Sequence, residues 1–191
     1  MAAGPVNLLR RAFLAVVPPD DVRAALDEVL GAGRPAAPAE LSWSRPAQWH
    51  LTVQFLGSVA DAHAVVAQAG AALHEAPAFA AALGGAGAFP STARASVVWI
   101  GLDRGLAELH GVAARSGAAL APLGFAPDPR PFTAHLTVAR ARRPCPVGTV
   151  LSSIGDGPLG RVWDVGEVVL FESDTRPTGA VHREVAVLPL G

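Results

Sequence analysis

The chain contains no lysine and no tyrosine, and it has a single cysteine. All 15 basic residues are therefore arginines. The missing lysine excludes Walker-A phosphate binding, Schiff-base chemistry and nucleotide transfer through a lysine adduct. Cys145, in a loop-like Pro-Cys-Pro, allows no internal disulfide and no paired-cysteine metal site. The chemistry of this protein has to come from other side chains.

The sequence also lacks an excess of charge of one sign and lacks long apolar runs. Its formal net charge is −1, so it has no global basic field of the kind that marks non-specific nucleic-acid binders. No apolar run approaches the roughly 20 residues that span a bilayer. Arg10 and Arg11 lie inside the apolar stretch near the start, unlike the arrangement in a signal peptide. We expect a protein of the cytoplasm that has no membrane partner and recognises any nucleic acid locally.

The hydrophobic pattern predicts strands in pairs, separated by helices. With 191 residues and 51% hydrophobic residues, the chain fits one domain, residues 1–191, that can bury a core of its own. Helices separated by strand pairs favour an α+β fold with antiparallel or mixed sheets. A glycine-rich turn is expected after residues 79–83. The expected strands are 10–17, 41–45, 49–56, 79–83, 95–102, 132–140, 162–173 and 181–190, and the expected helices are 20–30, 61–76, 106–123 and 146–155.

One tetrapeptide, His-Leu-Thr-Val, occurs twice, beginning at His50 and at His135. The copies lie about half the chain apart, and the order of elements around them is similar. A repeat can arise by chance in a composition this biased, but histidine is uncommon here, with 6 in all. The repeat therefore predicts two pseudo-symmetric lobes within one unit.

In a strand, residues two apart point to the same face, so each histidine projects together with its threonine, Thr52 or Thr137. If the two strands oppose one another, two imidazoles and two hydroxyls meet in one cleft. Imidazoles can act as acid and base near neutral pH, and hydroxyls can donate hydrogen bonds to phosphate oxygens. This set suits the opening of a cyclic phosphodiester by water without a metal or other cofactor. The other histidines form no metal-ligand spacing.

These residues resemble the motifs of the two-histidine phosphoesterases, and within them those of the RNA 2′,3′-cyclic phosphodiesterases, also described as 2′-5′ RNA ligases. H-L-T-V-Q-F-L-G is similar to the family's first motif, and H-L-T-V-A-R to its second. R-A-F-L-A-V, S-V-V-W-I-G-L, R-P-F-T-A-H and V-V-L-F-E-S are similar to other family segments, so the resemblance covers nearly the whole chain.

The resemblance implies a bilobal fold with the active site in a cleft between the lobes, and hydrolysis of RNA 2′,3′-cyclic phosphate ends to 2′-phosphates. It implies His50 as the acid toward the leaving 3′ oxygen and His135 as the base for water, although pseudo-symmetry makes these roles easy to reverse. Thr52 and Thr137 would hold the phosphate. No metal and no cofactor are implied, and we expect a monomer.

The resemblance also implies a phosphate contact for Arg140 and a terminal-base contact for Phe13. Strict alternation, however, puts Arg140 on the face opposite His135, so it reaches the cleft only if the strand twists or ends there. Phe13 equally suits a core position. Arg130 could lie near the cleft or in a surface loop. His182 stands where the family commonly has an aromatic residue such as tyrosine, and Pro-Phe-Thr-Ala-His also departs from the family pattern.

Three other functions remain open at this point. The same site could join a 2′,3′-cyclic end to a 5′-hydroxyl, as a 2′-5′ RNA ligase. It could act on the cyclic phosphate of a small nucleotide metabolite, such as an ADP-ribose derivative. A non-catalytic RNA-binding module could also retain the cleft.

Overall fold

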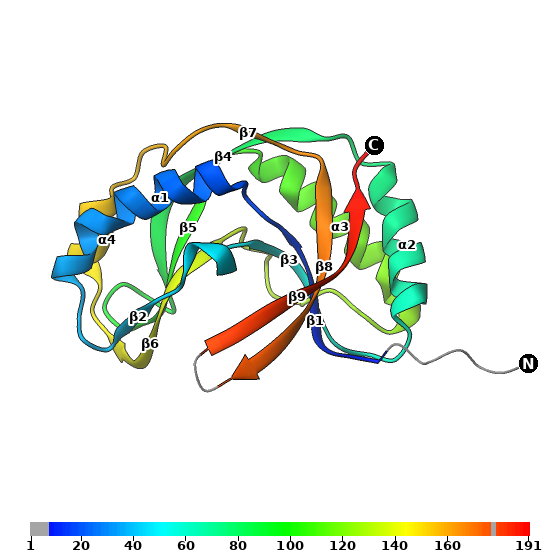
Figure 1. Ribbon diagram of the computed structural model, residues 1–191, viewed down its shortest axis with the longest axis horizontal. Helices are drawn as coiled ribbons and strands as arrows, with labels where there is room; N and C mark the ends of the chain where they lie inside the picture. Colours follow the sequence, from blue (N-terminus) through cyan, green and yellow to red (C-terminus); the bar gives the residue numbers. More distant parts are fainter. Residues whose placement is uncertain (1–7, 177–178) are drawn as a thin grey trace, which may run out of the picture.

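The computed structural model describes residues 8–176 and 179–191, and in this part of the chain nine strands form one curled sheet (Figure 1). The order is β7-β4-β5-β6-β3-β1-β8-β9, with β2 also paired to β6, and every recorded pairing is antiparallel. The strands are β1 (Leu9–Val16), β2 (Leu41–Trp43), β3 (Leu51–Val59), β4 (Phe79–Phe89), β5 (Ala95–Arg104), β6 (Leu136–Cys145), β7 (Trp163–Val165), β8 (Glu167–Arg176) and β9 (Gly179–Pro189).

The sheet has two halves with matching pairing patterns. In the first lobe, β3 pairs with β1 and β1 with β8; in the second, β6 pairs with β5 and β5 with β4. Each lobe thus contributes one His-x-Thr strand, and β3 and β6 meet at the middle of the sheet. The predicted α+β fold with two pseudo-symmetric lobes is confirmed. One sheet runs through both lobes.

In the described part of the chain, four α-helices cover the outside of this sheet in two pairs (Figure 1). They are α1 (Asp20–Gly33), α2 (Ala62–His74), α3 (Leu106–Leu120) and α4 (Gly148–Ile154). Helix α1 packs against α4, while α2 packs against α3, and α3 also packs on β3. Each helix buries apolar residues at helical spacing, such as Val22, Leu26 and Leu30 in α1. Each fully buried leucine contributes about 1.5–3 kcal/mol to this packing.

None of the helices in the described part of the chain is long and apolar enough to cross a bilayer.

The prediction of a turn after Leu83 is wrong, because β4 continues through the glycines to Phe89. Gly85, with φ +67°, lies at an irregularity in the β4–β5 register, where a left-handed residue fits. Gly87 is needed for a different reason. A Cβ at Gly87 would lie 2.2 Å from Cζ2 of Trp99, so the indole ring lies directly over this glycine.

The ends of several other elements also differ from the prediction. Helix α3 ends at Leu120, and a 3₁₀ turn (Ala121–Leu123) containing Pro122 follows it. The strand of the second motif begins at Leu136 rather than at residue 132. The predicted strand 162–173 is divided between β7 and β8 by Gly166.

Candidate active site

The two His-x-Thr motifs meet at a narrow seam between the lobes. Strands β3 and β6 pair at a single position, Leu51 opposite Leu136. These leucines directly follow the two histidines. Extending the antiparallel register by one residue in each direction sets His50 beside Thr137 and His135 beside Thr52. The fold therefore brings each imidazole next to the threonine of the other motif.

A β-bulge follows each threonine, and the two bulges occupy equivalent positions. In β3, Thr52 and Gln54 face consecutive residues of β1, so Val53 is the extra residue. In β6, Thr137 and Ala139 face consecutive residues of β5, so Val138 is the extra residue. A bulge shifts the alternation of faces by one. The fifth residues after the histidines, Phe55 and Arg140, consequently lie on the same face as the histidines.

This bulge brings Arg140 to the cleft face, to which strict alternation did not assign it. Arg140 is exposed, and its charge lies close enough to His50 to help lower the pKa of that imidazole. A strand irregularity, rather than a twist or an end of the strand, places this guanidinium.

Both imidazoles are held through the same ring nitrogen. Nδ1 of His50 lies 2.8 Å from the carbonyl oxygen of Gln48, and Nδ1 of His135 lies 2.7 Å from that of Thr133. A carbonyl oxygen only accepts, so Nδ1 of each neutral ring carries the hydrogen and donates it. Nε2 of each ring then has a lone pair to offer. Each histidine is thereby prepared to exchange a proton at Nε2.

Aromatic rings surround His50 on several sides. Its ring centroid lies 4.9 Å from that of Phe13, 5.1 Å from that of His182 and 6.5 Å from that of Phe171. Phe13 is only 3% exposed. Its ring packs against His50 and has no free face for a nucleobase. The base contact implied for Phe13 therefore has little support in the structure.

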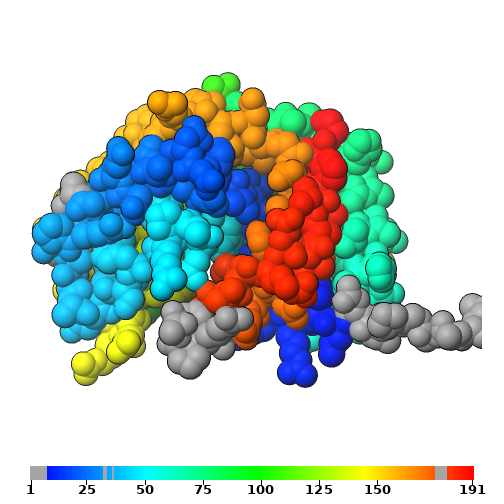
Figure 2. Space-filling view, in the orientation of Figure 1, coloured from blue at the N-terminus to red at the C-terminus, as the bar shows by residue number. Residues whose placement is uncertain are grey.

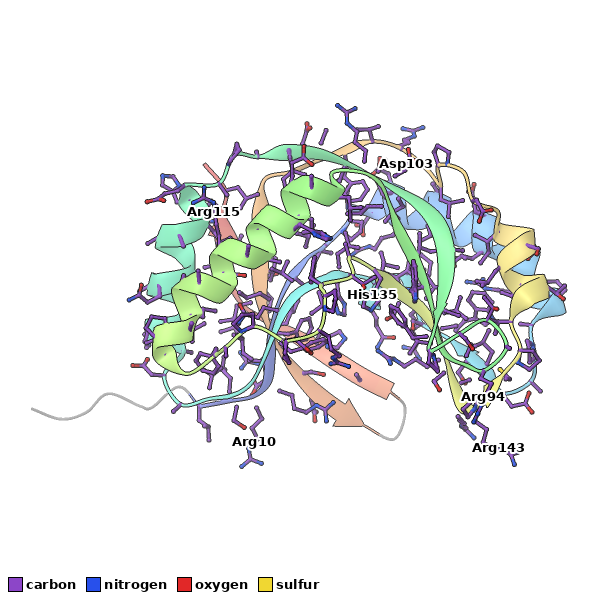
Figure 3. The ribbon with its side chains drawn as sticks, turned by 180° about the vertical axis from the view of Figure 1, so that it is seen from behind. Arg10, Arg94, Asp103, Arg115, His135 and Arg143 are labelled. Carbon is purple, nitrogen blue, oxygen red and sulfur yellow. The ribbon has the colours of Figure 1, made fainter. Side chains whose placement is uncertain are left out.

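His135 has a different aromatic neighbourhood, made by the β4–β5 hairpin. Its ring centroid lies 5.1 Å from that of Phe89, in an edge-to-face arrangement, and 6.2 Å from that of Trp99. In Figure 3, seen from behind, His135 lies between α3 and the strands β4 and β5. Trp99 also pairs with Thr137 across the two strands.

Burial lowers the pKa of His50 to about 4. The Gln48 carbonyl opposes this shift, while the charges of His182, Arg140 and His135 add to it. Desolvation disfavours the charged form of an imidazole, and neighbouring positive charges do the same. His50 is therefore neutral at pH 7 in the free protein. The influence of these three side chains also indicates that they converge on His50.

Comparison with known proteins identifies the family of this chain. The family model described as the 2′-5′ RNA ligase superfamily matches residues 18–177, a range that includes both motifs. The chain belongs to this superfamily. The RNA 2′,3′-cyclic phosphodiesterase of Aeropyrum pernix is 31% identical over 140 residues, covering 71% of this chain and 78% of the relative. That of Archaeoglobus fulgidus is 28% identical over 178 residues, covering 93% and 98%.

Two solved structures show the superfamily fold at nearly full length. A protein of Thermus thermophilus superposes with a TM-score of 0.77 at 28% identity, covering 94% of this chain and 97% of that one. LigT of E. coli, complexed with 3′-AMP, superposes with a TM-score of 0.74 at 22% identity, covering 95% and 98%. The resemblance drawn from the motifs is confirmed.

Two residues of this superfamily member were not singled out from the sequence, and a third was noted without a role. Phe55 is 74% exposed although it is a large apolar residue, and its ring lies 6.1 Å from that of Phe13. Trp99 lies against His135. His182 lies edge-to-face against both His50 and Phe13. None of the three has a local signal in the sequence: the face of Phe55 depends on a bulge set by the pairing with β1, and Trp99 and His182 reach the site by long-range packing.

A cavity of about 280 Å³ opens beside His50, lined by Gln48, Phe171 and His182 among others. The side-chain amide of Gln48 donates to the carbonyl of Ala180, which joins the 3₁₀ turn Pro46–Gln48 to β9. In Figure 2 the light-blue and cyan surface around this turn stands beside the red surface of β9.

The remaining residues considered in the sequence, Arg130 and Cys145, lie outside the seam in a surface loop and in the core. Arg130 is paired with Asp128 through its Nε and a terminal nitrogen, at 3.0 and 2.5 Å, and its side chain is 85% exposed, as suits a surface loop. Cys145 is buried, and burial raises the pKa of its thiol. Within residues 8–176 and 179–191, no three His, Cys, Asp or Glu residues gather in a way that could hold a metal ion.

Proposed function

We propose that this protein hydrolyses RNA 2′,3′-cyclic phosphate ends to 2′-phosphates, with the two histidines as acid and base. The observation that carries the proposal is the seam, where two His-x-Thr motifs meet and each ring is held through Nδ1, with no hydrogen bond at Nε2 from any described residue. The name of the Aeropyrum pernix relative, at 31% identity, supports the same reaction and the same class of substrate. So do the names of the relatives from Archaeoglobus fulgidus and Methanothermobacter thermautotrophicus.

In the proposed mechanism, neutral His135 takes a proton at Nε2 from a water molecule as the water oxygen attacks phosphorus. The bond from phosphorus to the 3′ oxygen breaks, and protonated His50 gives its Nε2 proton to that oxygen. The hydroxyls of Thr52 and Thr137 donate hydrogen bonds to the two non-bridging oxygens. The product carries a 2′-phosphate and a 3′-hydroxyl, and His50 and His135 have exchanged protonation states.

The lowered pKa of His50 bears directly on this assignment. An acid with a pKa of about 4 is mostly deprotonated at pH 7 in the free protein. A bound phosphate anion opposes that shift, because its negative charge beside the buried ring favours the protonated form of His50. In the proposal, substrate binding therefore raises the pKa of His50 and supplies the protonated form.

The two residues beyond the bulges would complete the substrate contacts. Arg140 is suited to a charge-assisted hydrogen bond with the phosphate. Phe55 offers an exposed ring next to Phe13, which in turn packs against His50, and the terminal base could stack on the Phe55 ring. This placement sets the terminal nucleoside on the His50 side, which agrees with His50 protonating the 3′ oxygen of that nucleoside.

The test is hydrolysis of a short RNA ending in a 2′,3′-cyclic phosphate, in the presence of a chelator, with identification of the product. We expect turnover to a 2′-phosphate that requires no added metal. Retention of RNA binding without turnover of RNA ends or cyclic mononucleotides would instead identify a binding module. Faster turnover of a small cyclic nucleotide metabolite than of RNA would change the substrate class.

We further propose that the protein acts in the cytoplasm as a monomer. Fractionation of cells and light scattering of the purified protein test these two statements.

A further inference from the structure

The strand that carries the second motif continues away from the seam into an arginine-rich tip. The second half of β6 contains Arg140, Arg142 and Arg143. Residues 141–144 have only Ser96 opposite them in β5, so this part of β6 bulges out of the sheet. In Figure 2 the yellow surface of this segment projects from the lower edge of the molecule. The arginines beyond Arg140 are thereby presented to solvent.

A further arginine joins this tip from the neighbouring strand. Arg94 directly precedes β5, which begins opposite Cys145, and Figure 3 shows Arg94 and Arg143 together at the lower end of the second lobe. We call Arg94, Arg142 and Arg143 the tip arginines. All three are exposed, and within the described residues none of them forms an ion pair. The carboxylate of Glu40 lies near Cys145, but a single negative charge leaves the tip positive.

The first lobe offers no equivalent basic surface. Beyond its motif, β3 ends in Q-F-L-G-S-V, which contains no charged residue. Arg10 and Arg11 lie on the neighbouring strand β1, but a carboxylate lies among them. Glu172 accepts a hydrogen bond from the backbone N–H of Arg10 at 2.8 Å and pairs with Arg183 at 2.6 Å. The unpaired positive charge that adjoins the seam is therefore that of β6.

The tip lies within reach of an RNA chain whose end occupies the seam. A strand advances about 3.3 Å per residue, so Arg143 lies at most roughly 20 Å from Thr137 along β6. Arg140 lies between them, and its charge acts on His50. Arginines arranged along such a path suit the phosphates of a single strand, which repeat along its backbone.

We propose that Arg94, Arg142 and Arg143 bind backbone phosphates of the RNA on the 5′ side of its cyclic end. The inference rests on the proposed function, which sets the cyclic phosphate at the seam. It makes an RNA chain a better substrate than a small cyclic nucleotide, because a mononucleotide has no phosphate that reaches the tip. The tip arginines thus select for the length of the substrate without touching the reacting atoms.

The experiment compares an RNA of about ten nucleotides that ends in a 2′,3′-cyclic phosphate with 2′,3′-cyclic AMP. In the double variant Arg142→Ser/Arg143→Ser, we expect kcat/KM for the RNA to fall about tenfold at about 50 mM salt, and the difference from wild type to shrink toward about 200 mM. The value for 2′,3′-cyclic AMP should not change. An equal loss on both substrates would overturn the inference.

The matched control is Arg104→Ser/Arg161→Ser, which removes the same net charge from two exposed arginines at the other end of the second lobe. Arg104 is the last residue of β5, about 30 Å along that strand from Arg94. We expect this control to behave as wild type on both substrates. A loss on RNA as large as that of the tip variant would show that only the overall charge matters, and would overturn the inference.

A second readout does not depend on turnover. Fluorescence anisotropy measures the binding of a labelled RNA of the same length that ends in a 2′-phosphate, over a range of salt concentrations. Each phosphate contact of a single strand contributes about 0.7 to the slope of log K against log salt, so the tip variant should lose about 1.4 from this slope. That loss, seen in a protein that hydrolyses nothing, would support the RNA surface and refute the proposed function. Hydrolysis with an unchanged slope would overturn the inference alone.

Discussion

The two lobes carry the same tetrapeptide but surround it differently. His50 lies among Phe13, Phe171 and His182, and burial with nearby positive charge keeps its pKa low. His135 lies against Phe89 and Trp99, beside a larger cavity whose wall is lined with glycine. The backbone contacts of the two rings are nevertheless the same. Pseudo-symmetry thus supplies two imidazoles that are held in the same way, and the packing of each lobe makes them chemically different.

The largest expected effect comes from removing either histidine. His50→Ala and His135→Ala should each reduce kcat on the order of 10²–10⁴-fold, because each removes one proton transfer. A substrate with sulfur in place of the 3′ oxygen has a leaving group that needs no protonation. It should restore much of the rate to His50→Ala and little to His135→Ala. Rescue of His135→Ala instead would reverse the two roles.

The threonines should show a smaller and more equal loss. Thr52→Val and Thr137→Val each remove one hydrogen bond to a charged phosphate oxygen, and we expect roughly a 10- to 100-fold lower kcat/KM. Thr52→Ser and Thr137→Ser keep the hydroxyl and serve as matched controls. Unchanged kcat/KM in the Val variants, or a loss confined to the Ser variants, would show that the hydroxyls do not hold the phosphate.

Phe55 and Arg140 occupy equivalent positions beyond the two bulges but differ in chemistry. Their substitution should therefore affect binding in different ways, one through base stacking and the other through a salt-dependent charge contact. Phe55→Ala should raise KM roughly tenfold for RNA ends, since one stacked base is lost. Arg140→Gln should weaken binding less at high salt than at low salt, because its contact is with a charge. Double substitution should give additive losses if the two contacts are separate. An unchanged KM in Phe55→Ala would show that the terminal base does not stack on Phe55.

The sequence was informative wherever local periodicity decides the structure. Alternation along a strand sufficed to put His50 with Thr52 and His135 with Thr137 on one face. It misplaced Arg140, because a bulge depends on the register of the neighbouring strand, and nothing local in Thr-Val-Ala-Arg records that Val138 is the extra residue. The glycine-rich stretch of β4 predicts a turn, whereas in the structure Gly87 makes room for the indole of Trp99 from the next strand. His182 and Phe171 reach His50 from the last hairpin, far away in the sequence.

The lowered pKa of His50 should make the stability of the folded protein depend on pH. Its pKa of about 4 lies below the ordinary value of 6.5, so between these values the unfolded chain binds a proton that the folded chain does not. This group therefore stabilises the fold fully above pH 6.5, and its contribution is lost as the pH falls toward 4. Urea unfolding across this range should show the loss, and it should be smaller in His50→Gln.

The smallest predicted effect is on the pKa of His50 and comes from replacing His182, which packs against His50 and has no counterpart beside His135. His182→Phe keeps an aromatic ring against His50 but removes a positive charge that lowers its pKa, so the pKa of His50 should rise modestly. An NMR titration of the His50 ring measures this shift, and addition of a 2′-phosphate product should raise the pKa further in both proteins. If the product left the pKa of the wild-type His50 ring unchanged, the bound phosphate would not be what keeps His50 protonated. His50 would then serve as the base, and the nucleoside would lie on the other side of the seam.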